Sequence, residues 1–205
     1  MLDMHFTHDV YLAGDLVFRP EAEALFGEMK AICARYGLRG VAPFDGQGDL
    51  SGLPAGVETT LAIITADRDL MDRCDAGLFC LDPFRRSADM DPGTAVEIGY
   101  MAAQGKKLEG YTADPRSYPE KVRAYRRAAW GDELRQRKSG GGTGTLEDAD
   151  GLIVHSEGMV QNGMTEGFII LSGGRVHGAS ILLEAFEQAV RTLADRLKAG
   201  DSSDR

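Results

Sequence analysis

Short apolar segments of strand length recur along the first half of the chain, and turn-forming or charged residues bound them. Apolar runs this short are typical of strands that are buried on both faces of a sheet. The pattern predicts four such strands, at Val10–Gly14, Leu38–Pro43, Ala76–Leu81 and Lys107–Thr112.

The segments between these strands have the spacing of amphipathic helices. In Pro20–Tyr36, apolar residues recur every three or four positions, and Gly37 follows as a stop signal. Val57–Arg73 and Asp91–Gly105 are the next two predicted helices. A loop rich in Gly, Asp and Pro, Phe44–Pro54, precedes the second helix.

Strands that alternate with helices predict an α/β domain with a parallel sheet covered on both faces. The order is typical of a flavodoxin-like or Rossmann-like doubly wound sheet, in which ligands bind beyond the carboxyl ends of the strands. Tyr11, Gln47, Pro83–Arg85 and Asp91 fall on those ends or in the loops after them. No GxGxxG or P-loop pattern follows a strand, which gives a nicotinamide or nucleoside triphosphate ligand little support.

After the fourth strand the pattern loosens. Ser117–Lys138 predicts a helix rich in Lys and Arg, which we interpret as a solvated face, and Ser139–Thr145 predicts a Gly-rich loop. Residues 146–177 carry no pattern that assigns them. Gly178–Ala199 has the spacing of a closing amphipathic helix.

The length of 205 residues suits one α/β domain of generous size. We predict a single domain over residues 1–200, with a helical and Gly-rich insertion at 113–150. The polar residues 201–205 predict a disordered tail.

The helix at Asp91–Gly105 contains the most informative side chain of the chain, Glu97. Asp91 suits the N-cap, Pro92 the first helical position and Gly105 a left-handed C-terminal cap. Glu97 is the only charged residue between Asp91 and Lys106, and its neighbours are mostly apolar, so we expect it to be buried. The positive end of the helix would favour the ionised carboxylate. Such a group is either a nucleophile or a buried Glu paired with an Arg elsewhere.

Composition narrows the class of partner. The net charge is −9, from 23 basic and 32 acidic side chains, which argues against a nucleic acid as the main partner. The three cysteines form no CxxC pair and the four histidines have no metal-ligand spacing, so we predict neither a metal site nor a cofactor. The chain has neither an apolar run long enough for a membrane span nor a signal-peptide pattern, which predicts a cytoplasmic protein without a membrane partner.

An ordered set of motifs resembles the nucleoside 2-deoxyribosyltransferase family. The resemblance covers residues 9–112 well and is patchier over 150–185. Arg86 departs from it, because many relatives have Gly there, and this adds positive charge to the loop. The matching motifs are Val10–Gly14, Gln47, Asp69–Asp75, Pro83–Arg85, Asp91–Gly99, Gly105–Lys106 and Asn162–Met164.

The resemblance implies catalytic roles for three residues. Glu97 matches the nucleophile that attacks C1′ of the deoxyribose. Tyr11 matches the tyrosine that positions this glutamate, and Asp91 matches an aspartate that contacts the base or helps to protonate it. From the residues alone, Tyr11 could equally be an ordinary strand aromatic and Asp91 a simple N-cap.

The resemblance also implies substrate contacts. Asp69 and Gln47 match residues near the base, although without the family Asp69 is better explained as part of an exposed helix face. Asn162 matches an asparagine that a neighbouring subunit contributes to hold the 5′-hydroxyl, with Met164 beside it, which implies a homodimer or larger homo-oligomer. From the residues alone, Asn162 before Gly163 is also typical of a turn. Met164 alone would be predicted to lie in the hydrophobic core. Gly14 and Phe18, after the first strand, complete the expected substrate contacts.

The function that the resemblance implies is transfer of a 2-deoxyribosyl group between nucleobases, with retained configuration. A carboxylate below the ring can trap the oxocarbenium-like sugar, and a second carboxyl near the base can protonate the leaving group. The alternatives are a hydrolase of nucleosides or of 5′-monophosphates, for which Arg85, Arg86 and Ser87 could bind phosphate, and a non-catalytic nucleoside-binding protein.

Overall fold

A five-stranded parallel sheet forms the centre of the computed structural model, which describes residues 6–48, 53–138, 140, 144–155 and 158–203. Its strand order is β2-β1-β3-β4-β8, and every neighbouring pair is parallel. The sheet confirms the α/β fold class, and its order is the flavodoxin-like one when β8 is counted as the fifth strand. The strands are β1 (His8–Ala13), β2 (Leu38–Val41), β3 (Ala76–Cys80), β4 (Lys107–Thr112) and β8 (Val176–Gly178).

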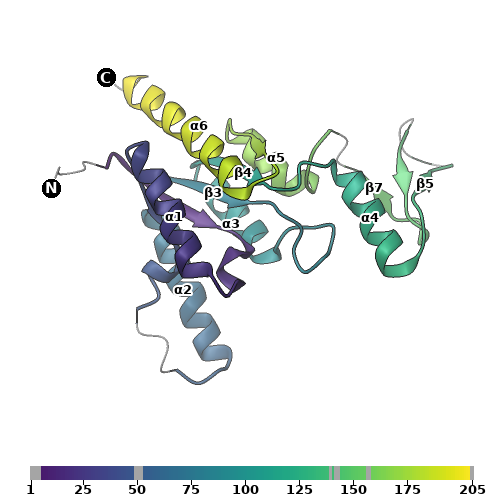
Figure 1. The fold of residues 1–205 in the computed structure, drawn as a ribbon, viewed down its shortest axis with the longest axis horizontal. Coiled ribbons are helices and arrows are strands. Elements are labelled where there is room, and N and C mark those ends of the chain that lie inside the picture. The colour runs from purple at the N-terminus through teal and green to yellow at the C-terminus, as the bar shows by residue number, and fades with distance from the viewer. Residues whose placement is uncertain (1–5, 49–52, 139, 141–143, 156–157, 204–205) are drawn as a thin grey trace.

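Helices cover both faces of this sheet (Figure 1). Helices α1 (Ala22–Arg35) and α6 (Leu182–Ser203) pack on one face. Helices α2 (Val57–Arg73), α3 (Pro92–Ala103) and α5 (Gly163–Leu171) pack on the other. This two-sided cover is the arrangement that the alternating pattern predicted.

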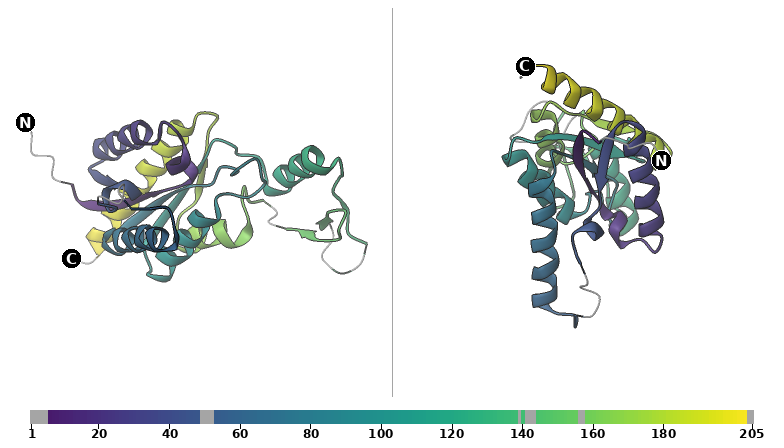
Figure 2. Two further views of the ribbon diagram at one scale, coloured as in Figure 1. Left: turned by 90° about the horizontal axis from the view of Figure 1, so that it is seen from below. Right: turned by 90° about the vertical axis from the view of Figure 1, so that its left-hand side faces the viewer.

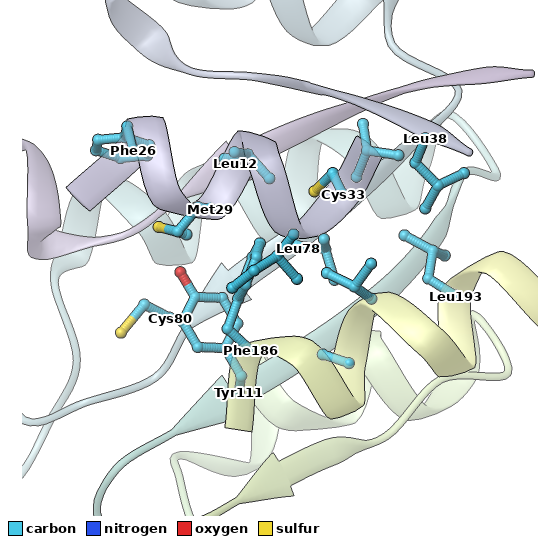
Figure 3. Packing of buried hydrophobic residues seen from close by; sticks show 14 of the residues in the cluster. Leu12, Phe26, Met29, Cys33, Leu38, Leu78, Cys80, Tyr111, Phe186 and Leu193 are labelled. Carbon is cyan, nitrogen blue, oxygen red and sulfur yellow. The ribbon is translucent and has the colours of Figure 1, made fainter. Parts of the chain in front are cut away.

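Alternate residues of each strand supply the two cores. On β1, Leu12 points towards α1 and α6, whereas Tyr11 points towards α2 and α3. Figure 3 shows the first core, in which the Tyr111 ring of β4 packs edge-on against Phe186 of α6 at 5.1 Å between ring centroids. Because side chains alternate across a strand, the position of Tyr11 is set by the register of β1.

After β4 the described residues 113–138, 140, 144–155 and 158–160 leave the sheet and form an arm that projects from the body (Figures 1 and 2). The arm contains α4 (Tyr118–Trp130) and a small antiparallel sheet in the order β5-β6-β7. The strands of this sheet are β5 (Arg135–Gln136), β6 (Leu146–Glu147) and β7 (Ile153–Val154). The prediction of a helical and Gly-rich insertion was therefore incomplete, because strands follow the helix.

Two predicted helices have different bounds in the structure. The prediction of a helix through Lys138 was wrong, because Gly131 adopts a left-handed conformation (φ 69°) and ends α4 at Trp130. The closing helix begins at Leu182 rather than Gly178, which instead closes β8. The prediction of a disordered tail was also wrong for residues 201–203, since α6 continues to Ser203, and residues 204–205 lie outside the described part.

The carboxyl ends of β1 and β3 meet at the centre of the sheet, where the strand order reverses. The short 3-10 helix η1 (Asp15–Phe18) follows β1, and the loop 81–91 follows β3. A second 3-10 helix, η2 (Pro43–Asp45), follows β2. No helix within the described residues is long and apolar enough to cross a membrane.

Candidate active site

A hydrogen bond joins the two residues on which the candidate site is built. The Tyr11 hydroxyl of β1 donates to Oε1 of Glu97 on α3, at 2.7 Å. Tyr11 is fully buried, so packing holds its ring in one position. The residues are 86 positions apart in sequence, and only the sheet with its covering helix brings them together.

Glu97 is half-buried and has no cationic partner among the described residues. Burial raises the pKa of Glu97 to about 7, and the nearby charges of Asp67 and Asp91 raise it further, whereas the Tyr11 hydrogen bond opposes the shift. Burial therefore opposes the ionised form, which the positive end of the helix would favour. No Arg in the described part of the chain pairs with Glu97, so the alternative of a buried Glu–Arg pair has no support there.

The two ends of helix α3 match the prediction, but one residue on its outer side is exposed. Asp91 caps it as predicted, accepting from the Thr94 backbone N–H at 2.9 Å and from its hydroxyl at 3.1 Å. Gly105 has the predicted left-handed conformation, with φ 72°. Not all of the apolar neighbours of Glu97 are buried, since Val96 is 72% exposed.

A carboxylate that the sequence analysis missed, Asp67 of α2, lies near Tyr11 and Glu97 and raises the pKa of both. Burial raises the pKa of Asp67 itself, although Gln47 donates a hydrogen bond to it from Nε2 to Oδ1 at 3.3 Å. Gln47 therefore reaches the site through Asp67. Asp69, two residues on, has a 48% exposed side chain that pairs with Arg68 at 3.0 Å.

Loops after β1 and β3 form a wall of the site. Phe18 is 62% exposed and lies against Phe84, at 5.7 Å between ring centroids, while the Arg85 guanidinium lies over the Phe84 ring at 4.6 Å. Gly14 begins this wall, and a Cβ there would come within 2.5 Å of the Cys80 Cβ. The residue must therefore be glycine for β1 and β3 to approach so closely.

Asn162 and Met164 lie at the start of α5. Asn162 is the N-cap, and its Oδ1 accepts from the Met164 backbone N–H at 2.9 Å. The Met164 side chain is 66% exposed, so its assignment to the core of one chain would be wrong. Among the described residues of one chain, no hydrogen bond connects either residue to Glu97.

A comparison with protein-family models bears directly on this site. The model described as nucleoside 2-deoxyribosyltransferase matches residues 10–164, which include Tyr11, Asp67, Asp91 and Glu97. The chain belongs to the nucleoside 2-deoxyribosyltransferase family. The family and the structural neighbours below indicate a glycosyl-transferring enzyme of the deoxyribosyltransferase superfamily.

Relatives of this 2-deoxyribosyltransferase family member cover nearly its whole length. Uncharacterized protein C191.05c of Schizosaccharomyces pombe (strain 972 / ATCC 24843) is 63% identical over 190 residues, 93% of this chain and 90% of that protein. The structure of a 2-desoxiribosyltransferase from Leishmania mexicana has a TM-score of 0.58 at 28% identity, over 89% of this chain and 97% of that one. A conserved protein from Enterococcus faecalis V583, with 16% identity and a TM-score of 0.52, covers 90% of this chain and 98% of that one, and shares the fold.

The deoxyribosyltransferase site thus combines predicted and unpredicted residues. Tyr11, Asp91 and the unpredicted Asp67 lie near Glu97, whereas Asp69 lines a hollow beside Gln47. The sequence contained a pattern that places Asp67 on the inward face of α2. Met71 and Cys74 follow Asp67 at helical spacing, and both are buried. The inward face of α2 was therefore readable from the apolar positions, and Asp69 does not lie on it.

Proposed function

We propose that the chain transfers a 2-deoxyribosyl group from one nucleobase to another through a covalent intermediate on Glu97. The ionised Glu97 carboxylate attacks C1′, an ester bond forms, and the N-glycosidic bond breaks as the base leaves with a proton. A second base then attacks C1′ from the opposite side to Glu97. Two inversions leave the configuration at C1′ retained, and preformed bases are reused as in nucleotide salvage.

The hydrogen bond from Tyr11 to Glu97 is the observation that carries this proposal. It fixes one carboxylate oxygen and leaves the other to face a substrate, in a place where burial has removed most solvation. A poorly solvated carboxylate with one directed hydrogen bond is the environment of an activated nucleophile. A purely structural Glu would instead need a cation, which the described residues do not supply.

Protonation of the leaving base is assigned to Asp67 or Asp91. Both carboxyls raise the pKa of Glu97, so both lie close enough to act on the same substrate. Asp67 is the stronger candidate for the acid because Gln47 holds it near Tyr11 and Glu97, and burial raises its pKa. Asp91 Oδ2 is already occupied by Thr94, and this leaves Oδ1 as its free oxygen.

The aromatic pair of the exposed Phe18 and the half-buried Phe84 is proposed to contact the nucleoside. An apolar ring pair at the carboxyl ends of the strands offers a flat surface for a base or a sugar face. Gln47, held by Asp67, adds an amide that can hydrogen-bond the base edge. The substrates expected are therefore neutral nucleosides and nucleobases.

A shared site between two copies of the chain is part of the proposal. The outer sides of α3 and α5 form an apolar face, and solitary monomers seldom expose apolar side chains so close together. Met164 is part of this face, and Asn162 caps the same helix, so a second copy packed there would bring both towards its neighbour. The α3–α5 face consists of Val96, Met164, Phe168 and Leu171, which are 72%, 66%, 36% and 81% exposed.

One incubation tests the reaction. Pure protein is mixed with 2′-deoxyinosine, with and without excess adenine, and the products are separated by chromatography. We expect 2′-deoxyadenosine to form only with adenine, and a Glu97→Ala control to form none.

Other outcomes of the incubation identify the alternatives. Free hypoxanthine without an exchanged nucleoside would overturn transfer in favour of a hydrolase, since water would then take the sugar from Glu97. No product from nucleosides of either base class would direct the test to 2′-deoxynucleoside 5′-monophosphates, and no product from these either would favour the non-catalytic binding protein. A pyrimidine donor, 2′-deoxycytidine, covers the second base class.

A further inference from the structure

A hollow of about 270 Å³ lies between the loop after β3 and helix α4, at the base of the arm. Neither Glu97 nor Tyr11 lines it, so it is separate from the nucleophile. Its polar lining consists of Arg86, Ser87, Asp114, Arg116, Lys121 and Tyr125.

The charge of this hollow is opposite to that of the whole protein. Arg86, Arg116 and Lys121 bring three positive charges, and Asp114 brings one negative charge. Asp114 is already occupied by Arg116, which donates to its two oxygens at 2.8 and 2.6 Å. A chain with a net charge of −9 therefore has a concave surface with excess positive charge, and this arrangement attracts anions.

Lys121 forms the floor of the hollow and is only 2% exposed. Its ammonium donates to the Val160 carbonyl at 2.7 Å, the one acceptor that the described residues give its three N–H groups. Burial lowers the pKa of Lys121, although Asp114, Asp82 and Glu166 favour the charged form and Arg116 opposes it. A buried ammonium with unused donors is stabilised by an anion that enters the hollow.

Arg86 forms the rim, and its backbone conformation is unusual. Its φ is 62° and that of Arg85 is 50°, and the left-handed region favours glycine over side chains with a Cβ. The two side chains differ in position, because Arg85 lies over Phe84 while Arg86 lines the hollow. Left-handed non-glycine residues persist mainly where function uses them.

We propose that this hollow binds a phosphate dianion, either inorganic phosphate or the phosphomonoester of a nucleotide, between Arg86 on the rim and Lys121 on the floor. The Arg86 guanidinium can donate two parallel hydrogen bonds to the phosphate oxygens. The Lys121 ammonium adds a compact positive charge with N–H groups that can donate to the same anion. The loop that contributes Arg86 also contributes Phe84 to the aromatic wall and Asp89, which accepts from Tyr118 of α4 at 2.9 Å. A bound phosphate therefore holds this loop against α4.

The test compares two glycine substitutions in the same loop. Arg86→Gly removes the cation, and glycine suits its φ, so the variant should fold normally. Arg85→Gly is the matched control, since it also relieves a left-handed residue but removes a side chain outside the hollow. Calorimetric titrations use inorganic phosphate and, separately, 2′-deoxyinosine 5′-monophosphate at constant ionic strength, with 2′-deoxyinosine as the phosphate-free probe.

Wild type and Arg85→Gly should bind at least one phosphate probe, and Arg86→Gly should bind it about tenfold more weakly or worse. Binding of inorganic phosphate would identify a free oxyanion as ligand, and binding of the nucleotide alone would identify a phosphomonoester. Equal affinity of Arg86→Gly and wild type, or no binding of either probe, would overturn the proposal. These titrations need no turnover, so their failure is distinct from failure of the transfer reaction.

Discussion

Glu97 is a residue at which burial opposes ionisation. Its carboxylate has to be ionised to attack a sugar, yet the folded protein raises its pKa from 4.5 to about 7. The folded state therefore binds this proton more tightly than the unfolded chain does. The stability that results is fully present below pH 4.5 and is lost as the pH rises through about 7.

Glu97→Gln should abolish transfer and make the protein more stable in mild alkali. Gln is neutral and can still accept the Tyr11 hydrogen bond, so it avoids the cost of a buried charge. We expect a gain in the free energy of unfolding of up to about 3 kcal/mol at pH 8.5 and little gain at pH 5. Urea unfolding at the two pH values measures this, and an equal gain at both would contradict the pKa of Glu97.

Asp67→Asn tests which carboxyl of α2 belongs to the site. Loss of its negative charge should lower the pKa of Glu97 and move the acid limb of the kcat/KM profile to lower pH. Loss of its proton should reduce kcat by about a hundredfold or more if it protonates the base. Asp69→Asn is the matched control. It should leave the acid limb of the kcat/KM profile and kcat unchanged, because Asp69 pairs with Arg68. A larger effect of Asp69→Asn would reverse the assignment.

At the scale of elements, α6 is attached to the sheet by a buried ionic cluster. Glu109 of β4 is fully buried, and its carboxylate accepts from Arg196 of α6 at 2.6 Å and contacts His177 of β8 at 3.0 Å. Arg196 also donates to the Leu108 carbonyl at 2.8 Å. The position of α6 therefore depends on this buried ion pair and its hydrogen bonds in addition to apolar packing.

Arg196→Met should therefore destabilise the fold by about 3 kcal/mol, since it leaves a buried carboxylate without its guanidinium. The matched control is Arg35→Met, which removes the exposed pair between α1 and Glu187 of α6 and should cost less than about 1 kcal/mol. Thermal unfolding of the two variants provides the comparison. Similar losses of stability would mean that the buried cluster adds nothing beyond a surface pair.

At the scale of the whole molecule, the exposed apolar α3–α5 face is the surface that we propose a second copy covers. Leu171→Lys should weaken self-association and lower the transfer rate per chain at low protein concentration, because the proposed contribution of Asn162 and Met164 is then lost. Leu152→Lys is the control, since Leu152 is 66% exposed but lies on the arm. Sedimentation measures the mass, and a fully active wild-type monomer would refute the shared site.

Local signals in the sequence determined most of the central sheet and singled out Glu97 as a lone carboxylate in an apolar helix. The apolar runs and their glycine stops are short-range features, so the four predicted strands and three helices around them were confirmed. Asp91 as N-cap was confirmed for the same reason, because a cap needs only its own first turn. The small sheet of the arm was missed because its two-residue strands carry no period.

Tertiary structure decided everything that depends on distance between segments. It placed Asp67 near Glu97, since the spacing of apolar positions indicates the inward face of α2 but not which residue of another helix that face meets. It raised the pKa of Glu97, because desolvation is a property of the assembled pocket and the helix dipole is a local one. It also joined Tyr11 to Glu97, because β1 carries the tyrosine and α3 the carboxylate, and the folded chain brings them within one hydrogen bond.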